Sequence, residues 1–188
     1  MKREDNFGKY VPNLKEYFKE TFQIFDRALT FATEKHKGQT RFNSGEPYIN
    51  HPIAVAAIVK KYPHNNEMLV AGYLHDTLED TNTTYEEIEK EFGKKVADLV
   101  LELTNDEAQM NAKGKAEYLL DKMNRMSTEA LIIKLADRLH NVSDFDTAKP
   151  KWRTKYKLQT ETILDGLKNL NATQQKLVKD IHNIIDKY

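Results

Sequence analysis

The sequence predicts an all-α fold, on three observations. Apolar residues recur at helical spacing along most of the chain, and sustained alternation with a period of two is hard to find. Residues that end or start helices, among them Gly38, Gly93 and Pro150, stand between these stretches. No internal repeat, low-complexity tract or domain boundary interrupts the 188 residues. We therefore expect one helical domain over residues 1–188, with C-terminal helices over about 152–187.

The first strong helical pattern covers residues 22–32 and ends near Gly38, which suits a C-terminal cap. The residues before it are expected to form a short lead-in helix or a loose arm. The loop that follows, residues 39–52, is rich in turn-forming residues and ends in His51-Pro52, where a helix over residues 53–61 begins. A loop with so many turn signals is a candidate binding loop.

The next helix, predicted over residues 67–76, leads into the motif LHDTLEDT, which gathers one imidazole and three carboxylates. If the motif is helical, His75 shares a face with Glu79, and Asp76 shares one with Asp80, because residues four apart lie one turn apart. Taken alone, the motif fits two interpretations equally well. It is the start of a metal site with a second carboxylate pair, or it is a solvated acidic helix end.

The rest of the chain continues the helical pattern. Helices are predicted over residues 85–92, 94–104, 115–126, 152–167 and 173–186, with a polar, mobile segment at 105–114. Ser127 is the expected N-cap of a helical stretch over residues 130–141, which is nearly all apolar up to Lys134 and should run through the core. Asp137 lies within that stretch, where a carboxylate is costly to bury unless a cation holds it.

Composition excludes several classes of function. Lys+Arg and Asp+Glu balance at 29 each, so no overall field recruits nucleic acid or an anionic membrane. Cysteine is absent, which removes disulfides, thiol nucleophiles and cysteine-type zinc sites. The N-terminal residues lack an apolar signal segment, and no apolar run is long enough to span a bilayer. We expect a soluble, cytoplasmic protein.

Four residues from three segments are predicted to form one metal site: His51, His75, Asp76 and Asp137. Two imidazoles and two carboxylates suit Mn²⁺, Fe²⁺ or Zn²⁺ better than Ca²⁺ or Mg²⁺, which prefer oxygen ligands alone. Taken singly, His51 could only cap a helix, and Asp137 could only pair with Lys134 one turn back. Taken together, the four residues favour the metal site.

Three motifs resemble those of the HD-domain metal phosphohydrolases, specifically the RelA/SpoT-type alarmone hydrolases. They are GEPYINHP at residues 45–52, HDTLEDT at 75–81 and KLADRLHN at 134–141, in the family's order. The likeness covers about residues 25–145, and the stand-alone small alarmone hydrolases are the closest type. The resemblance implies an HD-type helical bundle and hydrolysis of the 3′-diphosphate of (p)ppGpp to GDP or GTP and pyrophosphate, usually with one Mn²⁺.

The resemblance also implies roles for single residues. The four residues of the predicted metal site would hold the ion, and Glu79 and Asp80 would orient and deprotonate the attacking water. Arg41 would lie against the purine, and Asn141 would touch the ribose or a phosphate. Tyr156 lies where small members carry substrate-facing residues, although a core or surface tyrosine is equally plausible there.

Two departures from the family pattern leave the substrate open. Phe42-Asn43 follow Arg41 where many relatives have a single basic residue, and Ser143 stands where a basic residue is common. Both changes remove positive charge near the expected polyanion. Adenosine alarmones and NADPH therefore stay as alternative substrates, and a nucleotide sensor without turnover is the alternative outside the enzymes.

Further cations are expected at the pocket mouth, one or two from each of two groups. The groups are Lys113 with Lys115, and Lys149, Lys151, Arg153, Lys155 and Lys157. The other histidines are expected to be structural or exposed: His36, His64, His140 and His182.

Overall fold

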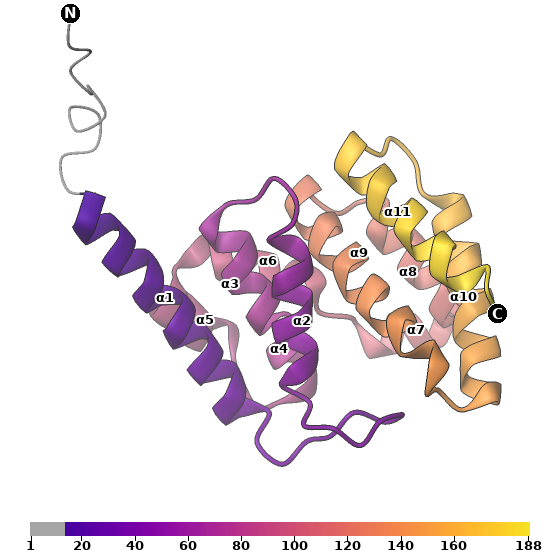
Figure 1. The fold of residues 1–188 in the computed structure, drawn as a ribbon, viewed down its shortest axis with the longest axis horizontal. Coiled ribbons are helices and arrows are strands. Elements are labelled where there is room, and N and C mark those ends of the chain that lie inside the picture. The colour runs from indigo at the N-terminus through magenta and orange to yellow at the C-terminus, as the bar shows by residue number, and fades with distance from the viewer. Residues whose placement is uncertain (1–13) are drawn as a thin grey trace, which may run out of the picture.

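The computed structural model describes residues 14–188, and within them the regular secondary structure is helical apart from one isolated bridge between Thr40 and Pro47 (Figure 1). The predicted all-α class is confirmed. The helices are α1 (Leu14–Lys35), α2 (Asn50–Val59), α3 (Asn66–Leu74), α4 (Thr77–Asp80), α5 (Tyr85–Phe92), α6 (Lys94–Leu103), α7 (Glu107–Lys113), α8 (Lys115–Met123), α9 (Thr128–Ser143), the 3₁₀ turn η2 (Asp144–Asp146), α10 (Pro150–Gly166) and α11 (Ala172–Ile185). Over the described range, none of them combines the length and apolar character that crossing a membrane needs.

Helix α9 is the central element of the bundle. It packs against α2, α3 and α6 on one side and against α11 on the other (Figure 1). As predicted, Ser127 caps it, since the Ser127 hydroxyl accepts a hydrogen bond from the amide of Ala130 at 3.2 Å. Every residue from Ala130 to Arg138 is buried, so Asp137 is carried into the interior by the apolar residues around it.

Helices α2 and α3 lie unusually close together because a glycine faces an alanine between them. A Cβ at Gly72 would come within 3.2 Å of the Ala56 Cα, so a larger residue there would push the two helices apart. The first residues of α2 and the last of α3 lie at the same end of this pair. Close packing therefore brings His51 and His75 together.

The helix predicted through the central motif is broken, which corrects one expectation. Helix α3 ends at Leu74, and α4 begins a separate turn at Thr77. Side chains compete for the last carbonyls of α3: the Thr77 hydroxyl donates to Leu74 O at 2.7 Å, and His75 Nδ1 contacts Gly72 O at 2.9 Å. Asp80 still lies one turn past Asp76, because its amide donates to the Asp76 carbonyl at 2.8 Å. Glu79 and His75 do not share a continuous helix.

Two other segments also differ from expectation. The residues expected as a mobile connection at 105–114 contain α7, which is capped by Asp106 through a 3.0 Å hydrogen bond from the Gln109 amide. Ahead of the first strong pattern, residues from Leu14 onward belong to the same helix, α1, and are not a separate lead-in helix. The earlier part of that expected arm lies outside the described residues.

Candidate metal centre

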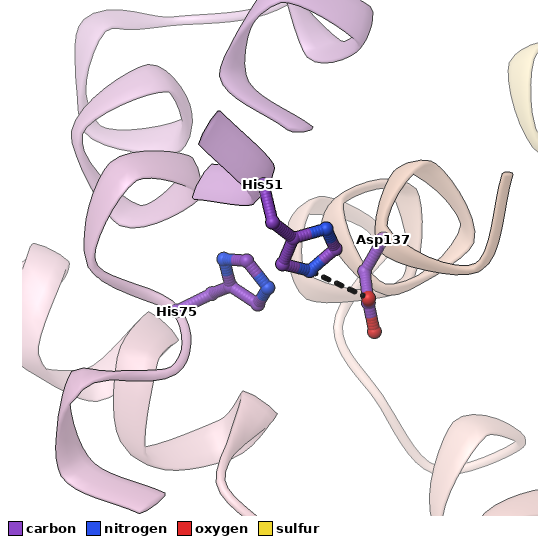
Figure 2. Close-up of side chains that lie close together, drawn as sticks. All are labelled: His51, His75 and Asp137. Atoms are coloured by element: carbon purple, nitrogen blue, oxygen red, sulfur yellow. Dashed lines mark ion pairs between the residues drawn. The ribbon is translucent and has the colours of Figure 1, made fainter. Parts of the chain in front are cut away.

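The four residues predicted to bind a metal come together at the junction of α2, α3 and α9, and Figure 2 shows three of them, His51, His75 and Asp137. His51, His75 and Asp137 each place one ligand atom within 4.8 Å of the others, and all three are buried. The His51 Nε2 atom lies 3.2 Å from Asp137 Oδ1. Asp76 completes the group, since its Oδ2 is 3.0 Å from His75 Nε2 and 3.6 Å from His51 Nε2.

The His75 ring is oriented for metal binding. Its Nδ1 faces the carbonyl of Gly72, which can only accept, so Nδ1 carries a proton and Nε2 is the nitrogen available to a cation. This Nε2 atom is buried and lacks a well-aligned hydrogen bond among the described residues, although Asp76 Oδ2 lies 3.0 Å away. A buried polar atom normally has a partner, and a cation at this point would supply one. The donor set of two imidazoles and two carboxylates fits a divalent transition metal.

Nearby positive groups keep the two carboxylates of the cluster ionised. Burial raises the pKa of Asp137, but Lys134 at 3.1 Å and His51 outweigh it, so the pKa lies well below its usual range. Burial likewise raises the pKa of Asp76, and the neighbouring His75 and His51 lower it further than burial raises it. Burial lowers the pKa of His75, whereas Asp76 and Asp137 raise it, and the net shift is upward. Asp137 therefore pairs with Lys134 and also faces His51, so the ion pair is not an alternative to the predicted metal site.

Tyr48, which the sequence analysis did not single out, connects the cluster to Asp80. Its hydroxyl donates to Asp76 Oδ2 at 2.6 Å and lies 3.3 Å from Asp80 Oδ2. Burial, followed by the charge of Asp76, raises the pKa of Tyr48, which keeps the phenol protonated and able to donate. Burial, Asp76 and Glu79 also raise the pKa of Asp80, so this carboxylate accepts a proton more readily than an unperturbed aspartate.

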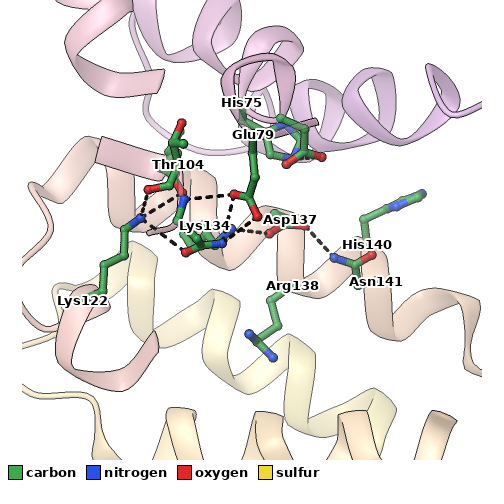
Figure 3. Close-up of polar contacts among 12 residues, drawn as sticks. His75, Glu79, Thr104, Lys122, Lys134, Asp137, Arg138, His140 and Asn141 are labelled. Atoms are coloured by element: carbon green, nitrogen blue, oxygen red, sulfur yellow. Dashed lines mark hydrogen bonds and ion pairs between the residues drawn. The ribbon is translucent and has the colours of Figure 1, made fainter. Parts of the chain in front are cut away.

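Glu79 points toward Lys134 and Asp137 (Figure 3). Asn105 holds its carboxylate, because the backbone amide donates at 3.0 Å and the side-chain amide contacts both oxygens at 3.0 and 3.2 Å. Lys122 stabilises the segment that carries Asn105, because its Nζ lies 3.2 Å from the Leu103 carbonyl oxygen and 3.3 Å from Asn105 Oδ1. Asn105 therefore fixes Glu79 beside the four candidate metal ligands.

The predicted substrate residues lie in the same cavity. Arg41 donates to Asn141 Oδ1 at 2.9 Å and to Asp144 Oδ2 at 2.7 Å, and Asn141 in turn donates to Asp137 Oδ1 at 2.6 Å. Tyr156 is half-buried, with the Arg138 guanidinium 5.1 Å from its ring centre. The cavity is lined by Arg41, Tyr48, His51, Asp76, Glu79, Asp80, Asn105, Lys115, Leu119, Lys134, Asp137, Arg138, Asn141 and Tyr156.

His140 was expected to be structural or exposed, and it is half-buried beside the cluster. Its Nδ1 lies 2.7 Å from His51 Nδ1, so it contacts a candidate ligand directly. Burial, followed by the neighbouring His51, lowers the pKa of His140 to about 4. Its position three residues after Asp137 was the available signal, because residues three apart share a helix face. His36 is buried as well, with Nδ1 facing Gln39 Oε1 at 2.7 Å.

One or two cations from each of two groups were expected at the pocket mouth. Lys115 from the first group lines this cavity, and Lys155 from the second joins it in an adjoining one. Several of the others have different partners: Lys113 pairs with Asp121, Lys157 with Glu161 at 3.6 Å, Arg153 donates to Phe145 O at 3.1 Å, and Lys149 lies 4.8 Å from the Phe42 ring centre. Lys134 and Arg138 are cavity cations that sequence reasoning did not assign to it.

Comparison with known proteins finds a family and relatives of similar sequence. Residues 28–171 match a family model described as "HD domain". The mouse protein named "Guanosine-3′,5′-bis(diphosphate) 3′-pyrophosphohydrolase MESH1" is 34% identical over 173 residues, which cover 89% of this chain and 96% of the mouse protein. The Escherichia coli K12 "Bifunctional (p)ppGpp synthase/hydrolase SpoT" is 37% identical over 147 residues, 75% of this chain but only 21% of SpoT.

A solved structure agrees with the sequence relatives. It is described as "A metazoan ortholog of SpoT hydrolyzes ppGpp and plays a role in starvation responses". The TM-score is 0.75 at 30% sequence identity, and the match covers 85% of this chain and 94% of that one. Likeness in fold and likeness in sequence therefore extend over most of the described residues.

A divalent cation should stabilise this protein against heat, because the donor set exists only in the folded chain. At about 100 times its dissociation constant, a cation contributes about 2.7 kcal/mol. We expect Mn²⁺ to raise the melting temperature of chelator-treated protein, measured by calorimetry. His75→Leu should abolish that rise, whereas His64→Leu, an exposed control in the loop at the far end of α2 and α3, should retain it. Equal rises for both variants would contradict the assignment.

Proposed function

The chain belongs to the HD-domain family, and from that premise we propose that it is a metal-dependent phosphohydrolase that removes the 3′-diphosphate of (p)ppGpp, giving GDP or GTP and pyrophosphate. The observation that carries this proposal is the meeting of four ligand side chains, three of which line one cavity together with two further carboxylates. A relative that carries this activity in its name matches the chain over 96% of its own length. A cytoplasmic location is part of the proposal, and the lack of cysteine is compatible with it.

His51, His75, Asp76 and Asp137 would hold one cation, for which we propose Mn²⁺ because the set mixes imidazole nitrogen with carboxylate oxygen. Bound there, a divalent cation polarises a phosphoryl oxygen and lowers the pKa of a water molecule. The protein supplies ionised ligands before the cation arrives, since Lys134 and the imidazoles hold the pKa values of Asp76 and Asp137 low.

Glu79 and Asp80 would orient and deprotonate the attacking water. Their environments divide this work between them. Asn105 clamps Glu79 with three contacts, so its carboxylate has a fixed direction suited to orienting the water. Asp80 has the raised pKa and a single long contact, from Tyr48 at 3.3 Å, which suits it to take the proton.

The nucleotide would lie over Arg41, Asn141 and Tyr156. Asp144 and Asn141 hold the Arg41 guanidinium in place, so a planar surface is ready for a purine to stack on. Because Asn141 also donates to Asp137, a chain of hydrogen bonds connects the nucleotide site to the candidate metal ligands. Lys115 is a cavity cation outside this chain, and we assign it to a phosphate group.

Turnover of a nucleotide panel tests the proposal. With Mn²⁺, the protein should release pyrophosphate from ppGpp, and Glu79→Gln and Asp80→Asn should each lower kcat by about 10²- to 10⁴-fold. Both variants should still take up Mn²⁺, because neither residue is an assigned ligand. Parallel assays with ppApp and NADPH separate the other substrates, since NADPH would release orthophosphate. Tight ppGpp binding without turnover with any divalent metal would instead identify a sensor.

Charge reversal in the cavity should weaken substrate binding selectively. Lys115→Glu places a carboxylate where we assign a phosphate, and loss of a charged contact costs about 1.5–3 kcal/mol, so KM should rise about 10- to 100-fold. Lys151→Glu makes the same change on an exposed residue of α10 outside the cavity lining and should leave KM within about twofold. Equal effects from the two variants would show that general charge, rather than this site, controls binding.

A further inference from the structure

His51 and His140 share a hydrogen bond that constrains both rings. Their Nδ1 atoms lie 2.7 Å apart, and the ring centres are 4.9 Å apart. Two lone pairs or two protons would repel at that distance, so one proton lies between the nitrogens. His140 projects from α9, one turn after Asp137 (Figure 3). The contact therefore joins a candidate ligand on α2 to the helix that carries another.

The surroundings of His51 determine which nitrogen holds the proton. Its Nε2 faces Asp137 Oδ1 at 3.2 Å and Asp76 Oδ2 at 3.6 Å, so without a cation Nε2 carries the proton toward these carboxylates. His51 Nδ1 is then the acceptor, and His140 Nδ1 is the donor. A cation reverses this, because a metal needs the Nε2 lone pair. The proton of His51 must then be on Nδ1, donated to His140.

The second imidazole differs in this respect. His75 Nδ1 faces a backbone carbonyl, which has no proton to give, so this nitrogen stays protonated with and without a cation. The partner of His51 is a ring that can donate or accept through the same atom. The Nδ1 proton of His75 is thus fixed in advance, whereas the Nδ1 atom of His51 can either carry a proton or accept one.

We propose that His140 is a positioning residue that exchanges tautomers with His51 when the cation binds. This inference rests on the proposed metal site. The His51 Nε2 proton leaves to solvent, the His140 Nδ1 proton passes to His51 Nδ1, and His140 Nε2 takes one proton from solvent. Both rings stay neutral, and the pair releases no net proton. His140 thereby presents the His51 lone pair to the cation.

Nitrogen NMR observes this exchange directly. Long-range ¹H–¹⁵N spectra of ¹⁵N-labelled protein assign the protonated nitrogen of each ring, and Zn²⁺ serves as a diamagnetic cation. On adding Zn²⁺, His51 should change from the Nε2–H to the Nδ1–H tautomer, and His140 from Nδ1–H to Nε2–H. His36 faces the Gln39 side chain outside the cluster and should not change. His140 retaining its tautomer while His51 shifts on metal binding would overturn the inference.

Substitution separates positioning from simple packing. His140→Leu fills the space without an acceptor and should weaken Zn²⁺ binding about 10- to 100-fold, measured by competition with a chromophoric chelator. His140→Gln offers an acceptor oxygen and should restore affinity to within about fivefold of the wild type. Equal affinities for the Leu variant and the wild type would overturn the inference. Equal losses in both variants would also overturn it, because packing alone would then explain the effect.

Failure of the metal site is a separate result. A wild-type protein that takes up no Zn²⁺ or Mn²⁺ overturns the proposed function, and the inference with it. If the wild-type protein and the His140→Leu variant bind the cation equally well, the inference is wrong and the proposed function is unaffected.

Discussion

Two ionised carboxylates buried at one junction are the constraint on which the site depends. Asp76 and Asp137 lie beside two imidazoles with little solvent to stabilise their charge, and an isolated buried ion costs several kcal/mol. Lys134, Tyr48 and Asn141 each contact one of the two carboxylates, which offsets part of that cost. A divalent cation would offset more. The same charge that makes the cluster costly to fold therefore makes it selective for a cation.

Packing elsewhere holds these groups together. Helix α9 is fixed by burial over Ala130–Arg138 and by the Ser127 cap, so the Asp137 backbone has little freedom to move away from the imidazoles. The close approach at Gly72 and Ala56 fixes the distance between α2 and α3. Hydrogen bonds from Asn105 and Tyr48 then orient the flanking carboxylates. Rigid elements position the ligands, and polar contacts between segments direct the atoms that react.

The sequence could predict what depends on local pattern. Asp137 stood out as an acid within an apolar helix, and the adjacent His75 and Asp76 predicted a shared site, which the structure brings together with His51. Contacts between distant segments were not predictable in this way: His140 meets His51 across 89 positions, and Asn105 meets Glu79 across 26. Lys113 illustrates the converse, since its basic character suggested a phosphate contact but its partner is Asp121 on the neighbouring helix. The break after Leu74 also escaped prediction, because it follows from side-chain bonds to helix carbonyls rather than from the apolar pattern.

Anomalous diffraction tests the central claim most directly. Crystals of the protein grown with Mn²⁺, measured on either side of the manganese absorption edge, locate the ion independently of activity. The account predicts one strong anomalous peak within about 2.0–2.4 Å of side-chain atoms of His51, His75, Asp76 and Asp137. A manganese peak bound by other residues, or full Mn²⁺ occupancy with these four side chains turned away from the ion, would contradict it.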